Sequence, residues 1–412
     1  MNFQRISFET FMGFISNLNI LLLLVGFPIF TLFAYGTAEV QVSNLPSVVF
    51  RACHLGIAVL IILLSKDRYY LKPASLLILL FVFFTCRILY DGFVRIDSCD
   101  MPLVVTQQLL LESIGFTFIP VLAIAYSFAY VNIDKVLRLT YWGLLLMMVI
   151  FLLRYLSGTV KVGNGRVSLS VAQSTLALAK FGGWLFLFSY ANLKTTQYSI
   201  KKVLYIMSFI LGLFCSFIAG SRGAAVGSVV ALFYLFLSFN NKNIHLIISI
   251  GVLLVILILW GDKVLSLLAN IFPVLFGRLE ATIDNGDTSG RDVIFKIAYQ
   301  RFCDNPILGD WYIIGSLKSS TNSAHNLTLE VASSLGLIGL IVLLLLYIKL
   351  LRAIFFLKNY PTMQILCALC ICMFVMSLSG GSITSPDYST IFMIVVLVYY
   401  KLKNQEYINE EY

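Results

Sequence analysis

Long apolar stretches separated by short polar ones dominate this chain. Each apolar stretch approaches the ~20 residues that a helix needs to cross a bilayer, and about twelve of them can be distinguished. The pattern therefore predicts an all-α integral membrane protein. The predicted spans centre on residues 18–35, 47–64, 74–90, 108–130, 139–157, 168–190, 203–219, 223–239, 244–260, 326–348, 362–379 and 389–402.

One long polar segment interrupts the apolar stretches. It divides the chain into a first set of transmembrane helices 1–9 (residues 1–260), a large loop (261–325) and transmembrane helices 10–12 (326–412). Within the loop, Ser289-Gly-Arg-Asp292 resembles a capping box with Asp in place of Glu. The residues Val293, Ile294, Ile297, Ala298 and Phe302 follow at helical spacing. We expect an amphipathic helix over about 290–303, lying on the membrane or on top of the helix bundle.

The distribution of Lys and Arg among the short loops predicts the orientation. Alternate loops are rich in these residues, which places those loops and both termini in the cytoplasm. The loop 261–325 then faces outward, in the periplasm or at an outer cell surface. The basic residues of the predicted cytoplasmic loops are Lys66, Arg68, Lys72, Lys135, Arg138, Lys194, Lys201, Lys202, Lys242, Lys349, Arg352, Lys358, Lys401 and Lys403.

Composition supports a membrane class and excludes others. Of the 412 residues, 59% are hydrophobic and only 12% are charged, which rules out an ordinary soluble domain. The net charge of +9 follows from the loop asymmetry and gives no reason to expect nucleic-acid binding. The eight cysteines form no disulfide framework, since most of them lie in predicted spans.

The pair His325-Asn326 stands at the mouth of a predicted span, directly after the polar loop. An imidazole at this position can take up a proton near neutral pH. The spacing places His325 on one helical stripe, small below the histidine, with Thr328, Ala332, Gly336 and Gly339. That stripe would let a neighbouring helix pack closely and hold the ring.

Cationic side chains gather at the predicted outer ends of the helices. Gly220-Ser221-Arg222-Gly223 forms a minimal turn between two apolar stretches, and Arg291 opens the loop helix. Guanidinium groups bind diphosphate oxygens through paired hydrogen bonds, so an anionic lipid-linked head group is the expected ligand. Arg154, Arg166, Arg278 and Asn326 are further candidates for substrate binding. Roles for Arg51, Arg87 and Lys180 are left open.

A metal site is not expected. Asp284-Asn-Gly-Asp287 offers oxygen ligands but lacks the rest of a calcium loop. Fixed cations can stabilise a departing diphosphate, so the predicted chemistry needs no divalent ion and no cofactor.

These residues resemble the O-antigen ligase and O-antigen polymerase superfamily of bacterial envelope polysaccharide enzymes. The resemblance rests on Ser221-Arg222-Gly-Ala-Ala, on Ser289-Gly-Arg291 followed by Asn305-Pro306-x-x-Gly309, and on Ala324-His325-Asn326 followed by Gly336-x-x-Gly339. Together these segments cover roughly residues 215–350, about a third of the chain. Asp310-Trp311 departs from the commoner pattern, in which small residues follow the glycine.

The resemblance implies an inverting, metal-independent membrane glycosyltransferase with a GT-C-like architecture. Its donor would be an oligosaccharide on undecaprenyl diphosphate. His325 would act as the general base on the acceptor hydroxyl, and Arg222 and Arg291 would bind the diphosphate.

The acceptor separates two versions of this function. A polymerase, which we favour, uses a second lipid-linked repeat unit and can work with a chain-length regulator protein; a ligase uses lipid A–core. A polysaccharide flippase or transporter is the alternative from another class. A transporter would need charges deep in the bundle and internal pseudo-symmetry, whereas the charges here collect at the helix ends.

Overall fold

A computed structural model describes residues 7–34, 45–66, 68–95, 107, 109–160, 162–163, 166–169, 174–239, 291–312 and 324–410. Within these residues the protein is built from helices, apart from a two-stranded antiparallel pair, β1 (Val162–Gly163) and β2 (Arg166–Val167). The chain is thus an all-α integral membrane protein, as the apolar pattern predicts.

The described residues form two compact units. Unit 1 draws on Met1–Phe27, Ser43–Thr140 and Arg291–Tyr412, and unit 2 on Pro28–Val42 and Tyr141–Gly290. This division by contacts differs in kind from the predicted division into helix sets and loop, which concerns the membrane and stays a prediction.

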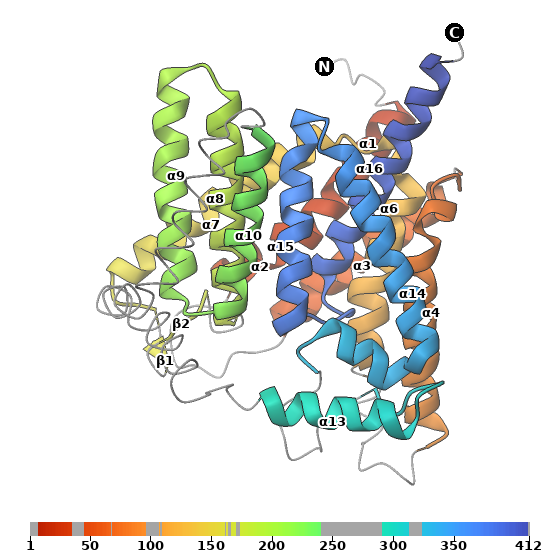
Figure 1. Cartoon of the computed structure of the whole chain (residues 1–412). Helices are drawn as coiled ribbons and strands as arrows, with labels where there is room; N and C mark the ends of the chain where they lie inside the picture. Colours follow the sequence, from red (N-terminus) through yellow and green to blue (C-terminus); the bar gives the residue numbers. More distant parts are fainter. Residues whose placement is uncertain are drawn as a thin grey trace. The chain divides into compact units, whose positions relative to one another are not determined.

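Unit 1 contains the start and the end of the chain. Its described elements, drawn in Figure 1, are α1 (Phe8–Leu21), the π-helical η1 (Leu22–Gly26), α3 (Leu45–Leu64), α4 (Leu71–Phe93), the π-helical η3 (Leu111–Phe118), α6 (Ile119–Ser127), η4 (Phe128–Tyr130), α13 (Arg291–Asp304), α14 (Leu327–Leu357), η5 (Pro361–Met363), α15 (Gln364–Gly380) and α16 (Pro386–Glu410).

Unit 2 contains most of α2 (Phe27–Ala34) and of α7 (Ile133–Leu156), and all of α8 (Thr175–Thr195), α9 (Ser199–Ile218) and α10 (Arg222–Phe239). Helices α8 and α9 approach each other closely where Gly182 faces Gly212. A Cβ atom on Gly182 would lie 2.7 Å from the backbone N of Ser216, and one on Gly212 would lie 2.7 Å from the carbonyl O of Gly182. Small residues at a helix contact allow this approach, as is common in membranes.

Ten of the predicted spans coincide with helices that are long and apolar enough to cross a membrane. The predicted span 244–260 lies outside the described residues. The predicted span 389–402 lies within α16, which is helical but is not among the ten. The predicted loop helix is present as α13, beginning at Arg291 and ending at Asp304.

Helix α14 is broken rather than straight. Gly336 has φ 63° and ψ −155°, a conformation outside the helical range. The segment that follows α13 fills this break: the Asp310 N–H donates to the Ser333 carbonyl (2.7 Å) and the Leu337 N–H donates to the Pro306 carbonyl (2.7 Å). The turn after α13 thereby supplies partners for backbone groups that the break would leave unpaired.

Two glycines make this contact possible. Gly309 also has a positive φ, 71°. A Cβ on Gly336 would lie 2.4 Å from the Ile307 carbonyl O, and a Cβ on Gly309 would lie 2.4 Å from the Ser334 carbonyl carbon. We call this contact of residues 306–310 with residues 333–338 the glycine lock. It fixes α13 to α14 within unit 1.

Candidate active site

His325 lies in a strained backbone conformation just before α14. Its φ is 51°, and it is the one non-glycine residue with positive φ in the described part of the chain. Such a conformation costs roughly 1–3 kcal/mol and persists only where the surroundings hold it. Ala324, fully buried, packs with Ala298 of α13 directly beside it. The backbone of His325 is therefore held where the buried contact of α13 meets the start of α14.

The predicted helical stripe below His325 is wrong in two respects. The helix begins at Leu327, so His325 precedes it and does not share its periodicity. Gly336 lies in the break, and its missing side chain admits the backbone of Ile307 and Gly309, not a neighbouring helix. The physical reason is that the turn after α13 docks into α14, which the spacing of small residues alone did not show.

Asn326 is the N-cap of α14. Its Oδ1 accepts from the Leu329 N–H (3.0 Å), and its Nδ2 donates to the Leu378 carbonyl O of α15 (3.0 Å). The side chain thus closes the helix start and ties it to the end of α15. The structure gives this residue a holding role next to His325. The prediction that it binds substrate stays untested.

Arg291 is brought close to His325 by the docking of α13. The helix lies across the end of unit 1 at which α14 begins (Figure 1), and Ile294 and Ala298 pack against Ala324 and Leu329. Burial lowers the pKa of His325, and the positive charge of Arg291 lowers it further. A pKa below the usual ~6.5 leaves the imidazole neutral at pH 7, the state required of a base.

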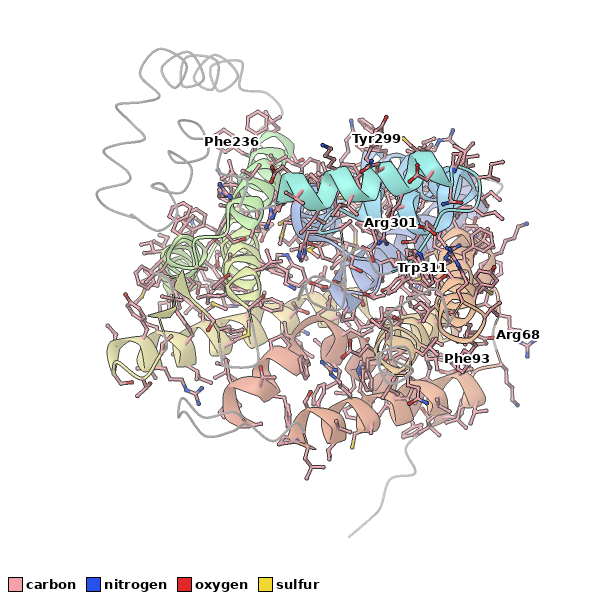
Figure 2. All side chains as sticks on the ribbon, turned by 90° about the horizontal axis from the view of Figure 1, so that it is seen from below. Arg68, Phe93, Phe236, Tyr299, Arg301 and Trp311 are labelled. Atoms are coloured by element: carbon pink, nitrogen blue, oxygen red, sulfur yellow. The ribbon has the colours of Figure 1, made fainter. Side chains whose placement is uncertain are left out.

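The face that α13 turns toward the helices differs from the predicted apolar face. Val293 and Ile297 are 57% and 37% exposed, so they do not belong to the docked face. The residues that are at least half-buried are Arg291, Ile294, Phe295, Ala298, Arg301 and Phe302. Figure 2 looks onto this end and labels Tyr299 and Arg301 on opposite sides of the helix. Contact with α14 determines which face of α13 is buried. That face includes Arg291 and Arg301, which a hydrophobic pattern does not identify.

Arg222 is placed as predicted within unit 2. Gly220, with φ 64°, makes the turn after α9, and Arg222 is the first residue of α10. The structure brings His325 and Arg291 together in unit 1. That Arg222 joins them in one site stays a prediction.

The remaining predicted cations are scattered. Arg154 lies in the last turn of α7 in unit 2. The backbone of Arg166 pairs in β2 with Gly163, while its side chain lies outside the described part of the structure. Arg278, like Ser289 of the capping box and the Asp284–Asp287 segment, lies outside the described residues. Among the described residues no group of three or more His, Cys, Asp or Glu side chains is arranged to hold a metal ion. This arrangement does not test whether the reaction needs a metal, so metal independence stays a prediction.

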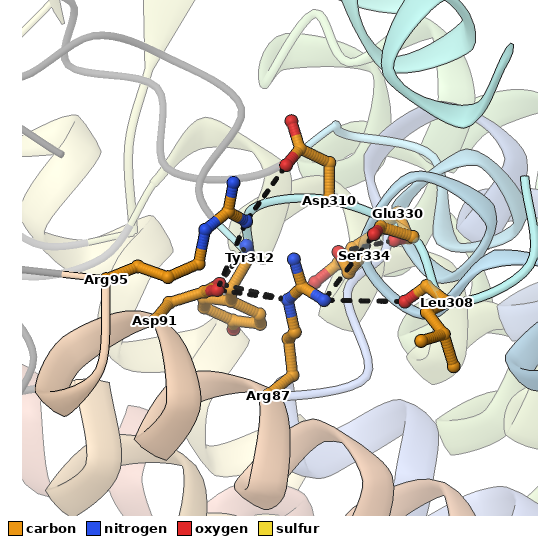
Figure 3. A network of polar contacts seen from close by, with 9 residues as sticks. Arg87, Asp91, Arg95, Leu308, Asp310, Tyr312, Glu330 and Ser334 are labelled. Atoms are coloured by element: carbon orange, nitrogen blue, oxygen red, sulfur yellow. Dashed lines mark hydrogen bonds and ion pairs between the residues drawn. The ribbon is translucent and has the colours of Figure 1, made fainter. Parts of the chain in front are cut away.

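A polar network that the sequence did not reveal supports the glycine lock from α4 (Figure 3). Arg87 Nε donates to Asp91 Oδ2 (3.1 Å), and Arg87 Nη1 donates to the carbonyl O atoms of Leu308 (3.4 Å) and Gly309 (3.5 Å). Asp91, only 1% exposed at its side chain, also accepts the Tyr312 N–H (2.8 Å). Arg87 thus has a structural role: it holds Leu308 and Gly309 of the glycine lock to α4.

Asp310 and Trp311, the departure from the commoner family pattern, have partners in the same network. Arg95 Nη1 lies 3.0 Å from Asp310 Oδ1, and its guanidinium carbon lies 4.0 Å from the Trp311 ring centroid. Arg87 and Asp91 are spaced i, i+4 on one helix, a signal available in the sequence. Nothing in the sequence relates them to residues 308–312, more than 200 positions away.

These observations define an all-α membrane protein whose best-formed site is a neutral, strained histidine beside an arginine at the mouth of α14. A family model described as O-antigen ligase matches residues 207–344, which include α10, α13 and the first half of α14. Over these residues, about a third of the chain, the protein is similar to the O-antigen ligase family. Among curated proteins, none matches this chain.

Proposed function

We propose that the protein is an envelope polysaccharide polymerase. It transfers an oligosaccharide from undecaprenyl diphosphate to a sugar hydroxyl of another lipid-linked repeat unit, with inversion and without a metal. The observation that carries the proposal is His325: a half-buried imidazole in a fixed conformation, with its pKa lowered by burial and by Arg291.

In the proposed reaction, His325 takes the proton of the acceptor hydroxyl as that oxygen attacks the anomeric carbon. The new bond joins the acceptor oxygen to this carbon, and the bond from the carbon to the diphosphate oxygen breaks. The electron pair leaves with undecaprenyl diphosphate, whose oxygens are bound by Arg291 and, in this proposal, by Arg222.

The pairing of His325 with Arg291 couples donor binding to base strength. A diphosphate bound to Arg291 offsets the charge that lowers the pKa of His325. The imidazole then becomes a stronger base once the donor is in place. A site without donor is a weaker base, which limits proton uptake before the leaving group has been bound.

The proposed location is the outer face of the inner membrane, with both termini in the cytoplasm and a GT-C-like arrangement of helices. The donor would be held by the membrane itself, and a chain-length regulator protein is a proposed partner. Nucleotide sugars, made in the cytoplasm, would not reach His325 directly.

A ligase is the second candidate, favoured by the description of the matching family model as O-antigen ligase. Its acceptor would be lipid A–core, with the same base and diphosphate residues. Reconstitution of the purified protein in vesicles with undecaprenyl-diphosphate oligosaccharide alone separates the two. Elongated lipid-linked product supports the polymerase; product that forms only after lipid A–core is added would replace it with the ligase.

A further inference from the structure

A cavity of about 160 Å³ lies in unit 1, apart from His325 and Arg291. Both π-helical segments border it, η1 through Leu22 and Leu23 and η3 through Glu112, Phe116 and Thr117. Single π-helical turns in helices occur frequently at functional sites. The backbone is thus irregular on two sides of the same cavity.

The cavity presents one cation and one anion side by side. Arg51 Nη1 lies 3.8 Å from Glu112 Oε1, longer than a hydrogen bond, and the two side chains are 31% and 43% exposed. The Arg51 guanidinium carbon lies 4.8 Å and 4.9 Å from the ring centroids of Phe27 and Phe116. The rings hold the guanidinium in place. Hydrogen-bond donors and acceptors therefore face a common space.

The charges indicate what kind of ligand fits. A phosphate attracted to Arg51 would meet the carboxylate of Glu112, and a hydrocarbon chain would use neither group. A neutral ligand with several hydroxyl groups can donate to Glu112 and accept from Arg51 at once. The aromatic rings of Phe27, Phe50 and Phe116 would cover its apolar face.

The size of the cavity sets the size of the ligand. An apolar cavity of about 150 Å³ is large enough for benzene. A cavity of about 160 Å³ therefore has room for one six-membered ring. A neutral pyranose is such a six-membered ring, and its hydroxyl groups can donate to Glu112 and accept from Arg51.

Hydrogen bonds connect the cavity to the start of α14. Thr384 lines the cavity, and its carbonyl O accepts from the Thr117 hydroxyl (2.6 Å). The hydroxyls of Thr384 and Ser382 are 2.9 Å apart, and Ser382 Oγ donates to Glu330 Oε1 (2.7 Å) in the first turn of α14. The turn between α15 and α16 thus joins the cavity wall to the helix that begins beside His325.

We propose that this cavity binds one neutral sugar residue of the glycan substrate. The inference rests on the proposed glycosyltransferase function, because an enzyme that transfers a glycan must also bind that glycan. Arg51 and Glu112 bind adjacent hydroxyls, and Phe27 and Phe116 pack on the ring. A residue anchored there fixes the position of its neighbours in the same oligosaccharide.

The test uses full-length protein in nanodiscs and the repeat-unit oligosaccharide freed of its lipid. Saturation-transfer NMR on the sugar protons reports binding without turnover. Glu112→Gln and Arg51→Lys are compared with the wild type and with Asp134→Asn, which changes an exposed carboxylate in the first turn of α7. Arg51→Lys keeps the charge and loses only the planar fork, so it provides a second, conservative variant.

The expected result is a weakening of oligosaccharide binding by about tenfold in both cavity variants, the size of one lost charged hydrogen bond. In transfer assays KM for one lipid-linked substrate should rise by a similar factor while kcat changes less than about twofold, and Asp134→Asn should match the wild type. The substrate whose KM rises shows whether the donor or the acceptor occupies the cavity.

Unchanged sugar binding and unchanged KM in both folded variants would overturn the inference. Wild-type protein that binds the oligosaccharide through Arg51 and Glu112 but transfers nothing would instead contradict the proposed function and leave the cavity assignment standing. Equal NMR signals from wild type and both variants, with transfer intact, would contradict only the cavity.

Discussion

At the scale of single residues, the arrangement around His325 separates position from basicity. Its left-handed backbone and the buried contact of Ala324 with Ala298 fix where the backbone of His325 lies. Burial and the charge of Arg291 set its pKa. These are distinct physical causes, so a change in Arg291 should alter the proton affinity of His325 without removing the ring.

Arg291→Gln provides the corresponding prediction. Loss of the positive charge should raise the pKa of His325 toward its ordinary value. Because the base must be neutral, transfer falls as pH drops through this pKa, so the acid limb of kcat/KM for the donor, which reports the donor-free enzyme, should move to higher pH. Transfer at the plateau should also fall, since a diphosphate ligand is lost. Initial rates between about pH 4.5 and 8.5 measure both effects.

Lys296→Gln is the matched control, because Lys296 is an exposed cation on the same helix. It should leave the acid limb unchanged. An acid limb that stays in place in Arg291→Gln, or that moves equally in both variants, would show that Arg291 does not set the pKa of the catalytic group.

At the scale of elements, the glycine lock is the feature that positions α13, and with it Arg291. Gly336→Ala would place a methyl group 2.4 Å from the Ile307 carbonyl O at a φ of 63°. Both the clash and the backbone strain are unfavourable, so we expect a fall of several degrees in melting temperature in detergent and strongly reduced transfer. Scanning fluorimetry and a transfer assay measure the two.

Gly56→Ala in α3 is the control for that change. A Cβ there would have no neighbour within 4 Å, and alanine favours helix, so stability should be unchanged or slightly raised. If Gly336→Ala behaved like Gly56→Ala, the turn after α13 would not depend on the break in α14.

The sequence predicts the elements better than it predicts how they dock. Hydrophobic stretches located the described spans, and the motif around Arg291 located α13, because length and local periodicity determine these features. The break at Gly336, the capping role of Asn326 and the exposed side of α13 at Val293 depend on a contact between the turn 306–310 and α14. A single sequence contains no signal for such a contact, beyond the presence of two glycines that allow it.

The same limit applies to the candidate site. His325 and Arg291 were selected by residue type and by position at helix ends, and their proximity within unit 1 agrees with that selection. The Arg87–Asp91–Arg95–Asp310 network was missed, because its halves are distant in sequence. It shows that a charge beside a span can serve packing as well as chemistry.

At the scale of the whole molecule, the proposed function requires a particular orientation in the membrane. His325 and α13 must face outward, while the other end of α14 faces the cytoplasm. In a cysteine-free background, Lys296→Cys on α13 should react with a membrane-impermeant maleimide in intact spheroplasts. Lys358→Cys, exposed at the C-cap of α14, should react only after permeabilisation.

The reverse labelling pattern would place His325 in the cytoplasm and contradict the use of an outward-facing lipid-linked donor. Equal labelling of both sites in intact spheroplasts would indicate leaky membranes, which an endogenous cytoplasmic thiol protein would reveal in the same samples.

The most direct measurement of the central claim is glycan transfer by purified His325→Ala in reconstituted vesicles. His325→Ala should lose at least about a hundredfold in rate, the typical contribution of a general base, with unchanged elution and melting behaviour. A flippase would still move its lipid-linked substrate across the vesicle membrane in this variant. Wild-type rates of transfer from folded His325→Ala protein would contradict the assignment of His325 as the base.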